Sequence, residues 1–201
     1  MRKRLTAALA VATLVLVPSA IAFASYTWTD VDGSTGNWYS MAVSDGGLVA
    51  YSSQHRLAGP TVGQGRIWKT ADGGVSWSEI MTSPTYANWP HVATSGSGNV
   101  VAGIGFALGS SYTTIQISSD AGTTWSPATA AGNLQWTGVA LSQNGSIVYA
   151  TSKNTTGTDG SVKKSIDGGT TWTNVTPEFG GFLLNGGSWT GVATSSDGSR
   201  V

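Results

Sequence analysis

Aspartate is placed more regularly in this chain than any other chemically active residue type. Asp72, Asp120 and Asp167 each stand third in an eight-residue pattern, and the copies read TADGGVSW, SSDAGTTW and SIDGGTTW. A carboxylate there could act as a general acid or base, ligate a cation, or accept backbone N–H groups across a tight turn. The first two roles need further carboxylates or oxygen ligands, and each copy carries a single acid. The pattern therefore favours a structural turn and predicts no metal site.

Other residues that could do chemistry are scarce. The chain has no cysteine, and its two histidines, His55 and His91, stand neither in a metal-binding spacing nor beside a nucleophile motif. His91 lies inside a strand-like run, where a packed or edge position is the simpler interpretation. Glycine-rich stretches such as 103–105 precede no helical pattern that could present phosphate-binding amides. We therefore identify no catalytic residue and no cofactor-binding residue. Glycoside hydrolysis stays open, because it needs only two suitably spaced carboxylates among ten acids.

Tryptophan reveals the repeat that positions these aspartates. The octapeptides end at Trp77, Trp125 and Trp172, which are 48 and 47 residues apart, and Trp28 lies where an upstream copy would end. A second series interleaves with the first at spacings of 51, 47 and 53, and it comprises Trp38, Trp89, Trp136 and Trp189. A period near fifty residues with two fixed tryptophans indicates one small unit used repeatedly.

Each unit carries the pattern of four short strands. In the clearest unit the predicted strands are 136–142, 147–150, 161–165 and 171–175, joined by a tight turn, a polar loop and the octapeptide. Since no helical periodicity follows the signal-like start of the chain, we predict an all-β fold, a β-propeller of four-stranded antiparallel blades. A β-sandwich or β-helix is the alternative, but neither explains paired tryptophans at this period.

The octapeptide resembles the Asp-box, or BNR repeat, of sialidases and other secreted propellers. The residues that match its defined positions are Thr70, Asp72, Gly74, Ser76, Trp77, Ser118, Asp120, Gly122, Thr124, Trp125, Ser165, Asp167, Gly169, Thr171 and Trp172. The resemblance implies turns that lie far from an active-site mouth. Because carboxylate acceptors, glycines and a packed tryptophan suit such turns, we interpret these residues as structural.

The resemblance extends to the repeat and not to an enzyme. For a sialidase it implies an FRIP-like segment, three substrate-binding arginines, a tyrosine with a glutamate partner, and an acid/base aspartate. After residue 24 the chain has three arginines, Arg56, Arg66 and Arg200, has no FRIP-like segment, and places no tyrosine close to Glu79 or Glu178. We therefore favour a binding module without catalytic residues. A sialidase-like glycoside hydrolase with catalytic residues beyond residue 201, and a propeller similar to photosystem assembly factors, remain the alternatives.

The first 24 residues predict export. Arg2, Lys3 and Arg4 precede an apolar stretch, and 22–24 read Ala-Phe-Ala, which favours cleavage between Ala24 and Ser25. An uncleaved anchor over 5–24 is the alternative. Cleavage removes three of the ten basic residues and none of the ten acidic ones, so the mature net charge is −3. We therefore expect a secreted or surface protein that binds a glycan or an extracellular protein, and neither nucleic acid nor, after cleavage, a membrane.

Variable loops are the expected ligand face. Strand order places the loops 53–64, 106–112 and 153–160, and those between units, on the face opposite the octapeptides, and function usually lies in such loops. The candidate residues there are His55, Arg56, Tyr86, Lys153, Asp159, Glu178, Phe179 and Phe182.

The repeats also suggest a domain organisation. We expect a signal peptide over 1–24 and a partial propeller over 25–201, with blades near 36–77, 87–125 and 134–172 and an incomplete blade from 187. About three and a half blades would leave open sheet edges, so we expect the N-terminal part of a longer propeller. Residues 26–31 resemble a closing strand for its last blade.

Overall fold

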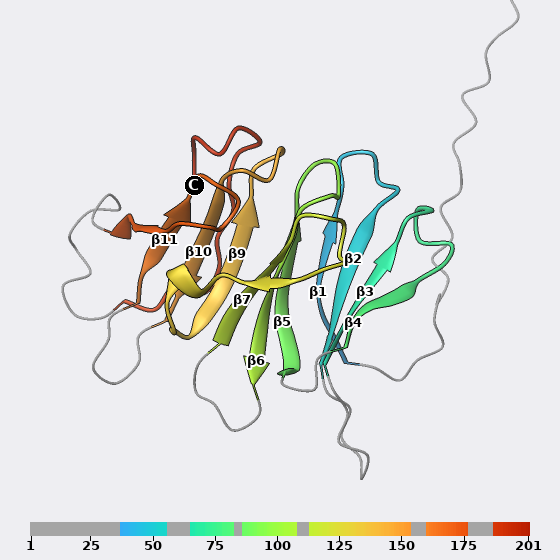
Figure 1. The fold of residues 1–201 in the computed structure, drawn as a ribbon, viewed down its shortest axis with the longest axis horizontal. Helices are drawn as coiled ribbons and strands as arrows, with labels where there is room; N and C mark the ends of the chain where they lie inside the picture. The colour runs from blue at the N-terminus through green and yellow to red at the C-terminus, as the bar shows by residue number, and fades with distance from the viewer. Residues whose placement is uncertain (1–36, 56–64, 83–85, 108–112, 154–159, 177–186) are drawn as a thin grey trace, which may run out of the picture. The chain divides into compact units, whose positions relative to one another are not determined.

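The computed structural model describes residues 37–55, 65–82, 86–107, 113–153, 160–176 and 187–201 (Figure 1). The expected signal peptide, the upstream strand around Trp28, and several loop candidates lie outside the described residues. Those candidates are Arg56, Asp159, Glu178, Phe179 and Phe182. No helix in the described part of the chain is long and apolar enough to cross a membrane.

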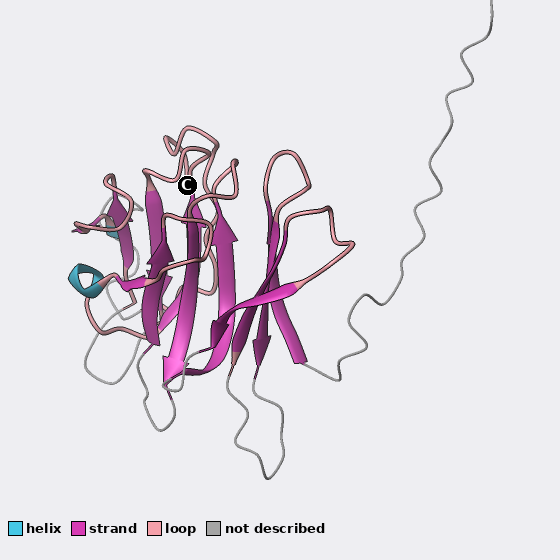
Figure 2. Cartoon of the chain, turned by 45° about the vertical axis from the view of Figure 1, so that its right-hand side comes forward, coloured by secondary structure: helices cyan, strands magenta, loops and turns pink. Residues whose placement is uncertain are grey.

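Antiparallel sheets make up the fold (Figure 2). There are three, each with four strands, and in each sheet the strands pair in chain order. The first contains β1 (Asn37–Val43), β2 (Ala50–His55), β3 (Arg66–Thr70) and β4 (Ser78–Thr82). The second contains β5 (Tyr86–Thr94), β6 (Val101–Ala107), β7 (Thr113–Ser118) and β8 (Ser126–Pro127), followed by the 3-10 turn η1 (Thr129–Ala131). The third contains β9 (Trp136–Leu141), β10 (Val148–Ser152), β11 (Val162–Ser165) and β12 (Thr173–Asn174). Such sheets, packed on one another in chain order, are blades of a β-propeller.

Two strands differ most from the sequence expectation, while β9, β10 and β11 differ from it by one or two residues at their ends. The fourth strand of the third blade is predicted over 171–175, but only Thr173 and Asn174 pair with β11, because the octapeptide turn holds the residues before them. The run after Trp189 forms no strand, since no second strand pairs with it in the described residues. It still lies against the third blade, where Tyr149 donates its hydroxyl to the Gly198 carbonyl at 3.1 Å.

The core lies between blades. Trp89 of β5 is fully buried against Tyr51 and Ile67 of the first blade. Trp136 of β9 packs in the same way against Ile104 and other apolar residues of the second blade. Trp189 packs beside the third blade. Three members of the second tryptophan series, Trp89, Trp136 and Trp189, therefore pack against the blade that precedes them, whereas Trp38 of the first blade is exposed.

At the turns 95–100, 142–147 and 195–200, a glycine lies close to a side chain of the preceding blade. The first two turns join the first and second strands of their blades, and 195–200 is the corresponding turn in the run after Trp189. A Cβ on Gly98, Gly145 or Gly198 would lie within 3 Å of Val49, Val100 or Ile147 of the preceding blade, respectively. All three glycines have a positive φ. These turns and the turn 44–49 of the first blade lie at the upper ends of the sheets in Figure 1. We call this end of the strands the turn face and the opposite end the loop face.

Candidate functional site

Each octapeptide aspartate accepts hydrogen bonds within its own turn. Asp120 Oδ1 accepts the Ser118 hydroxyl at 2.7 Å and the Thr124 backbone N–H at 2.8 Å, and Oδ2 accepts the Thr124 hydroxyl at 2.6 Å. The Ser118 oxygen in turn accepts the Gly122 N–H at 2.8 Å. Asp72 and Asp167 take the same partners in their own turns. These carboxylates are thus held as acceptors that organise a turn.

Hydrogen bonding also changes the acidity of these aspartates. In Asp72, Asp120 and Asp167 the hydroxyl of the residue four positions later, followed by its backbone N–H, lowers the pKa from 3.8 to about 2. Each carboxylate is therefore ionised near neutral pH and lacks the raised pKa of a general acid. No group of three or more His, Cys, Asp or Glu side chains that could hold a metal ion occurs in the described residues.

The depressed pKa values predict a loss of stability in acid. A carboxyl whose pKa is lower in the folded state stabilises the fold above its unfolded pKa, and this contribution disappears as pH falls towards the folded value. We expect the melting temperature to decrease between about pH 4 and pH 2. Thermal unfolding of the parent and Asp120→Asn across this range tests the assignment. The variant should be less stable at pH 6 and approach the parent at pH 2, and a constant difference would contradict it.

The loop face carries an exposed tyrosine, Tyr39, which the sequence analysis did not select and which stacks on the predicted candidate His55. In β1, Trp38 pairs with Gln54 and Ser40 pairs with Ser53, so Tyr39 is the extra residue of a β-bulge. Tyr39 is 57% exposed, and its ring stacks on that of His55 with a centroid distance of 4.9 Å and an interplanar angle of 22°. The corresponding positions of the other units hold Pro90, Thr137 and Thr190, and this departure from the repeat is the signal that could have identified Tyr39.

Other loop-face candidates are only partly described. Lys153 follows β10 and occupies the same place in its blade as His55, with its backbone N–H donated to the Gln135 carbonyl at 3.1 Å. Tyr86 begins β5, but its side chain lies outside the described part.

The Arg66 guanidinium pairs with the Glu79 carboxylate at 3.2 Å at the same end of the first blade. His91 lies within β5, and burial lowers its pKa. Within the described residues, the ring of His55 therefore lies against that of Tyr39.

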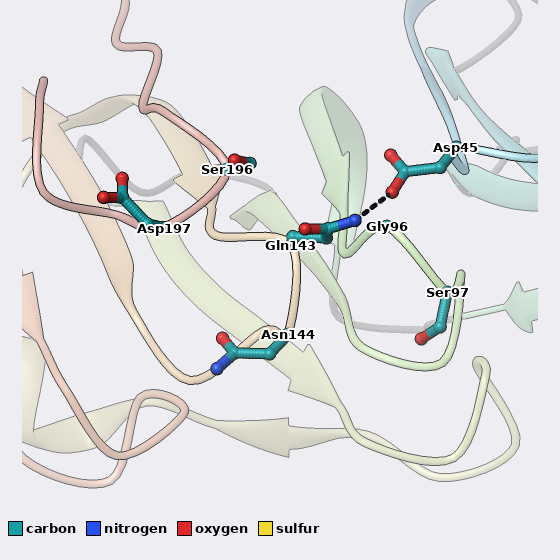
Figure 3. Close-up of a pocket in the computed structure, with 7 residues that line it drawn as sticks. All are labelled: Asp45, Gly96, Ser97, Gln143, Asn144, Ser196 and Asp197. Carbon is teal, nitrogen blue, oxygen red and sulfur yellow. Dashed lines mark hydrogen bonds between the residues drawn. The ribbon is translucent and has the colours of Figure 1, made fainter.

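The turn face carries a pocket built by four equivalent turns, 44–49, 95–100, 142–147 and 195–200 (Figure 3). Asp45 N donates to the Gly96 carbonyl, Gly96 N to the Gln143 carbonyl, and Gln143 N to the Ser196 carbonyl, at 2.9, 2.8 and 2.7 Å. One residue from each turn thus joins a chain of backbone hydrogen bonds across the blades. The pocket has a volume of about 540 Å³ and is lined by Asp45, Gly96, Ser97, Gln143, Asn144, Ser196 and Asp197.

A side-chain hydrogen bond crosses this pocket. Gln143 Nε2 donates to Asp45 Oδ2 at 2.7 Å, and Gly96 lies between the two residues (Figure 3). A Cβ on Gly96 would collide with the Asp45 carboxylate and lie 2.6 Å from Gln143 Cγ. The absence of a side chain at Gly96 therefore lets residues of the first and third blades meet. Sequence reasoning predicted a tight turn between 136–142 and 147–150 of the clearest unit and could not place it beside the turns of other units.

The fold and its two candidate surfaces define a repeat protein of the β-propeller class. No family model matches the chain, and no curated protein matches it. Among solved structures, the chain is similar to a GH74 enzyme from Niastella koreensis, at 18% identity and a TM-score of 0.55 over 70% of this chain and 22% of that one. It is also similar to a chain of a nidogen/laminin complex, at 15% identity and a TM-score of 0.52 over 68% and 47%.

A third similar structure is the GH74 xyloglucanase from Xanthomonas campestris, at 17% identity and a TM-score of 0.50 over 77% of this chain and 24% of that one. The chain therefore spans less than half the length of each of these structures. Likeness at such identity shows the fold and leaves the activity to be argued from the sites.

Proposed function

We propose that this chain is a secreted or cell-surface β-propeller that binds a glycan through its loop face and has no catalytic role. The observation that carries the proposal is the exposed Tyr39 ring stacked on His55. Aromatic rings in exposed positions offer an apolar face on which the C–H groups of a sugar ring can pack. An extracellular protein is the second class of ligand that the composition allows.

The local structure supports a binding role for Tyr39. The β-bulge places one additional side chain at the loop end of β1. The same bulge occurs at Thr137 in β9, so the bulge belongs to the repeat, whereas the aromatic ring placed on it belongs to the first blade alone among the described units. Stacking on His55 restricts the ring before any ligand arrives, which lowers the entropy lost on binding. The remaining units have no aromatic residue at this position, so the repeat by itself does not require one.

Glycan binding by the full chain tests the proposal. On a glycan array we expect retention of at least one neutral or acidic oligosaccharide, and Tyr39→Ala should weaken that binding by about tenfold, the equivalent of about 1.4 kcal/mol. Tyr39→Phe keeps the ring and should bind within about threefold of the parent. Equal binding by parent and Tyr39→Ala would contradict the proposed site, and turnover of aryl glycosides would contradict the non-catalytic role.

A further inference from the structure

We propose that the turn-face pocket is a second binding site, which takes a neutral polyhydroxylated ligand such as one pyranose residue. This inference is independent of the loop-face proposal, because it rests on residues at the opposite strand ends. The pocket volume of about 540 Å³ lies within the range of small-molecule sites. None of the seven residues that line it is basic or aromatic, so its chemistry is that of hydroxyl, carboxamide and carboxylate groups.

The side chains of the pocket are held in place before a ligand binds. Asp45 is fixed by the Gln143 amide through Oδ2, which leaves Oδ1 as an acceptor. Asp197 Oδ1 accepts the Ser195 hydroxyl at 2.6 Å and the Ser199 N–H at 3.0 Å, and the Ser199 side chain also hydrogen-bonds to this carboxylate. Carboxylates restrained in this way lose little conformational freedom when a ligand hydroxyl donates to them.

Asn144 supplies the opposite hydrogen-bonding character. Its Oδ1 accepts the Ser142 hydroxyl at 2.8 Å, the Ser146 N–H at 3.0 Å and the Ser146 hydroxyl at 2.8 Å. The oxygen is therefore satisfied, and the amide nitrogen is the atom that can donate to a ligand. Gln143 shows the reverse arrangement, because its nitrogen is bound to Asp45 and its Oε1 can accept.

The mixture of donors and acceptors favours hydroxyl groups over a cation. A sugar hydroxyl donates one hydrogen bond and accepts others, so it can bridge an amide nitrogen and a carboxylate oxygen. A metal ion or an ammonium group uses acceptors alone and would leave the Asn144 amide unmatched. The geometry of the four turns therefore points to a ligand with several adjacent hydroxyls.

The experiment titrates the full chain with D-glucose, D-galactose and D-mannose by saturation-transfer NMR and calorimetry, with putrescine as the cationic probe. We expect at least one hexose to bind. Asn144→Asp should weaken the binding of that hexose by about tenfold, because the amide that donates a hydrogen bond becomes a charged acceptor. The turn should survive this change, since Asp197 occupies the same position in the turn 195–200. Ser196→Tyr is a second variant, which fills the pocket and leaves the backbone bonds in place.

Two matched controls locate the effect. Asn99→Asp introduces the same charge in the neighbouring turn, outside the pocket, and Tyr39→Ala removes the loop-face ring. Hexose binding that survives both controls and is lost in Asn144→Asp and Ser196→Tyr supports the site. No hexose binding by the parent, equal loss in Asn144→Asp and Asn99→Asp, or binding of putrescine alone overturns it. Loss in Tyr39→Ala only would place the sugar on the loop face, which overturns this inference and supports the proposed function.

Discussion

Replacing Trp89 by alanine is expected to lower the free energy of unfolding by about 3 to 5 kcal/mol. The Trp89 side chain is fully buried between the first two blades, and its indole N–H donates to the Gly65 carbonyl at 3.2 Å. The variant therefore loses apolar burial, opens a cavity between blades, and leaves the Gly65 carbonyl without this donor. Urea unfolding followed by far-UV circular dichroism measures the change independently of tryptophan fluorescence.

Trp38 provides the matched control, because it holds the same place in the repeat with a different environment. Trp38 is 41% exposed and makes an edge contact with Trp68 at a centroid distance of 6.2 Å. We expect Trp38→Ala to lower the free energy of unfolding by only about 1 kcal/mol. Equal losses in the two variants would show that the space between blades is not the main source of stability.

Replacing Gly145 by alanine is expected to destabilise the protein by about 2 to 4 kcal/mol. Gly145 has a φ of 74°, where a Cβ is strained, and the added carbon would lie 2.6 Å from Val100 Cγ2 and 2.7 Å from Val100 Cβ. Because Val100 belongs to the preceding blade, relief of this overlap requires the two blades to separate locally. The melting temperature and the urea midpoint should both decrease.

Gly46 offers the control for this glycine effect. It lies in the corresponding turn of the first blade, where an added Cβ would meet nothing within 4 Å, and its φ is not positive. Gly46→Ala should therefore change the free energy of unfolding by less than about 1 kcal/mol. A large loss in Gly46→Ala, or none in Gly145→Ala, would contradict the role assigned to close packing between the turns.

The two candidate binding surfaces differ in how the repeat produces them. Tyr39 and His55 depart from the pattern of the other units, so the loop-face surface belongs to one blade. The turn-face pocket instead collects residues from four successive units, linked by backbone hydrogen bonds from Asp45 to Ser196. Substitutions at one surface should therefore leave ligand binding at the other unchanged.

The octapeptide turns are the part of the structure that local sequence predicts best. Serine or threonine, aspartate and glycine at fixed positions predict a turn, and the hydrogen bonds of Asp120 to Ser118 and Thr124 follow from groups within seven residues. The period of the tryptophans likewise defines a repeated unit. Because each unit carries the pattern of four short strands, the repeat predicts a β-propeller. The lengths of β8 and β12 were less predictable, since each strand has only two residues and the pairing depends on its neighbour.

By itself, the sequence determined the repeat, the strand order of each blade and the turn made by each octapeptide, because these depend on residues close together in the chain. Only the tertiary structure decided which turns lie side by side, so that Gln143 reaches Asp45 across Gly96, and that Tyr39 stacks on His55. Contacts between blades depend on the twist, the register and the bulges of whole sheets, which no single unit of the sequence encodes.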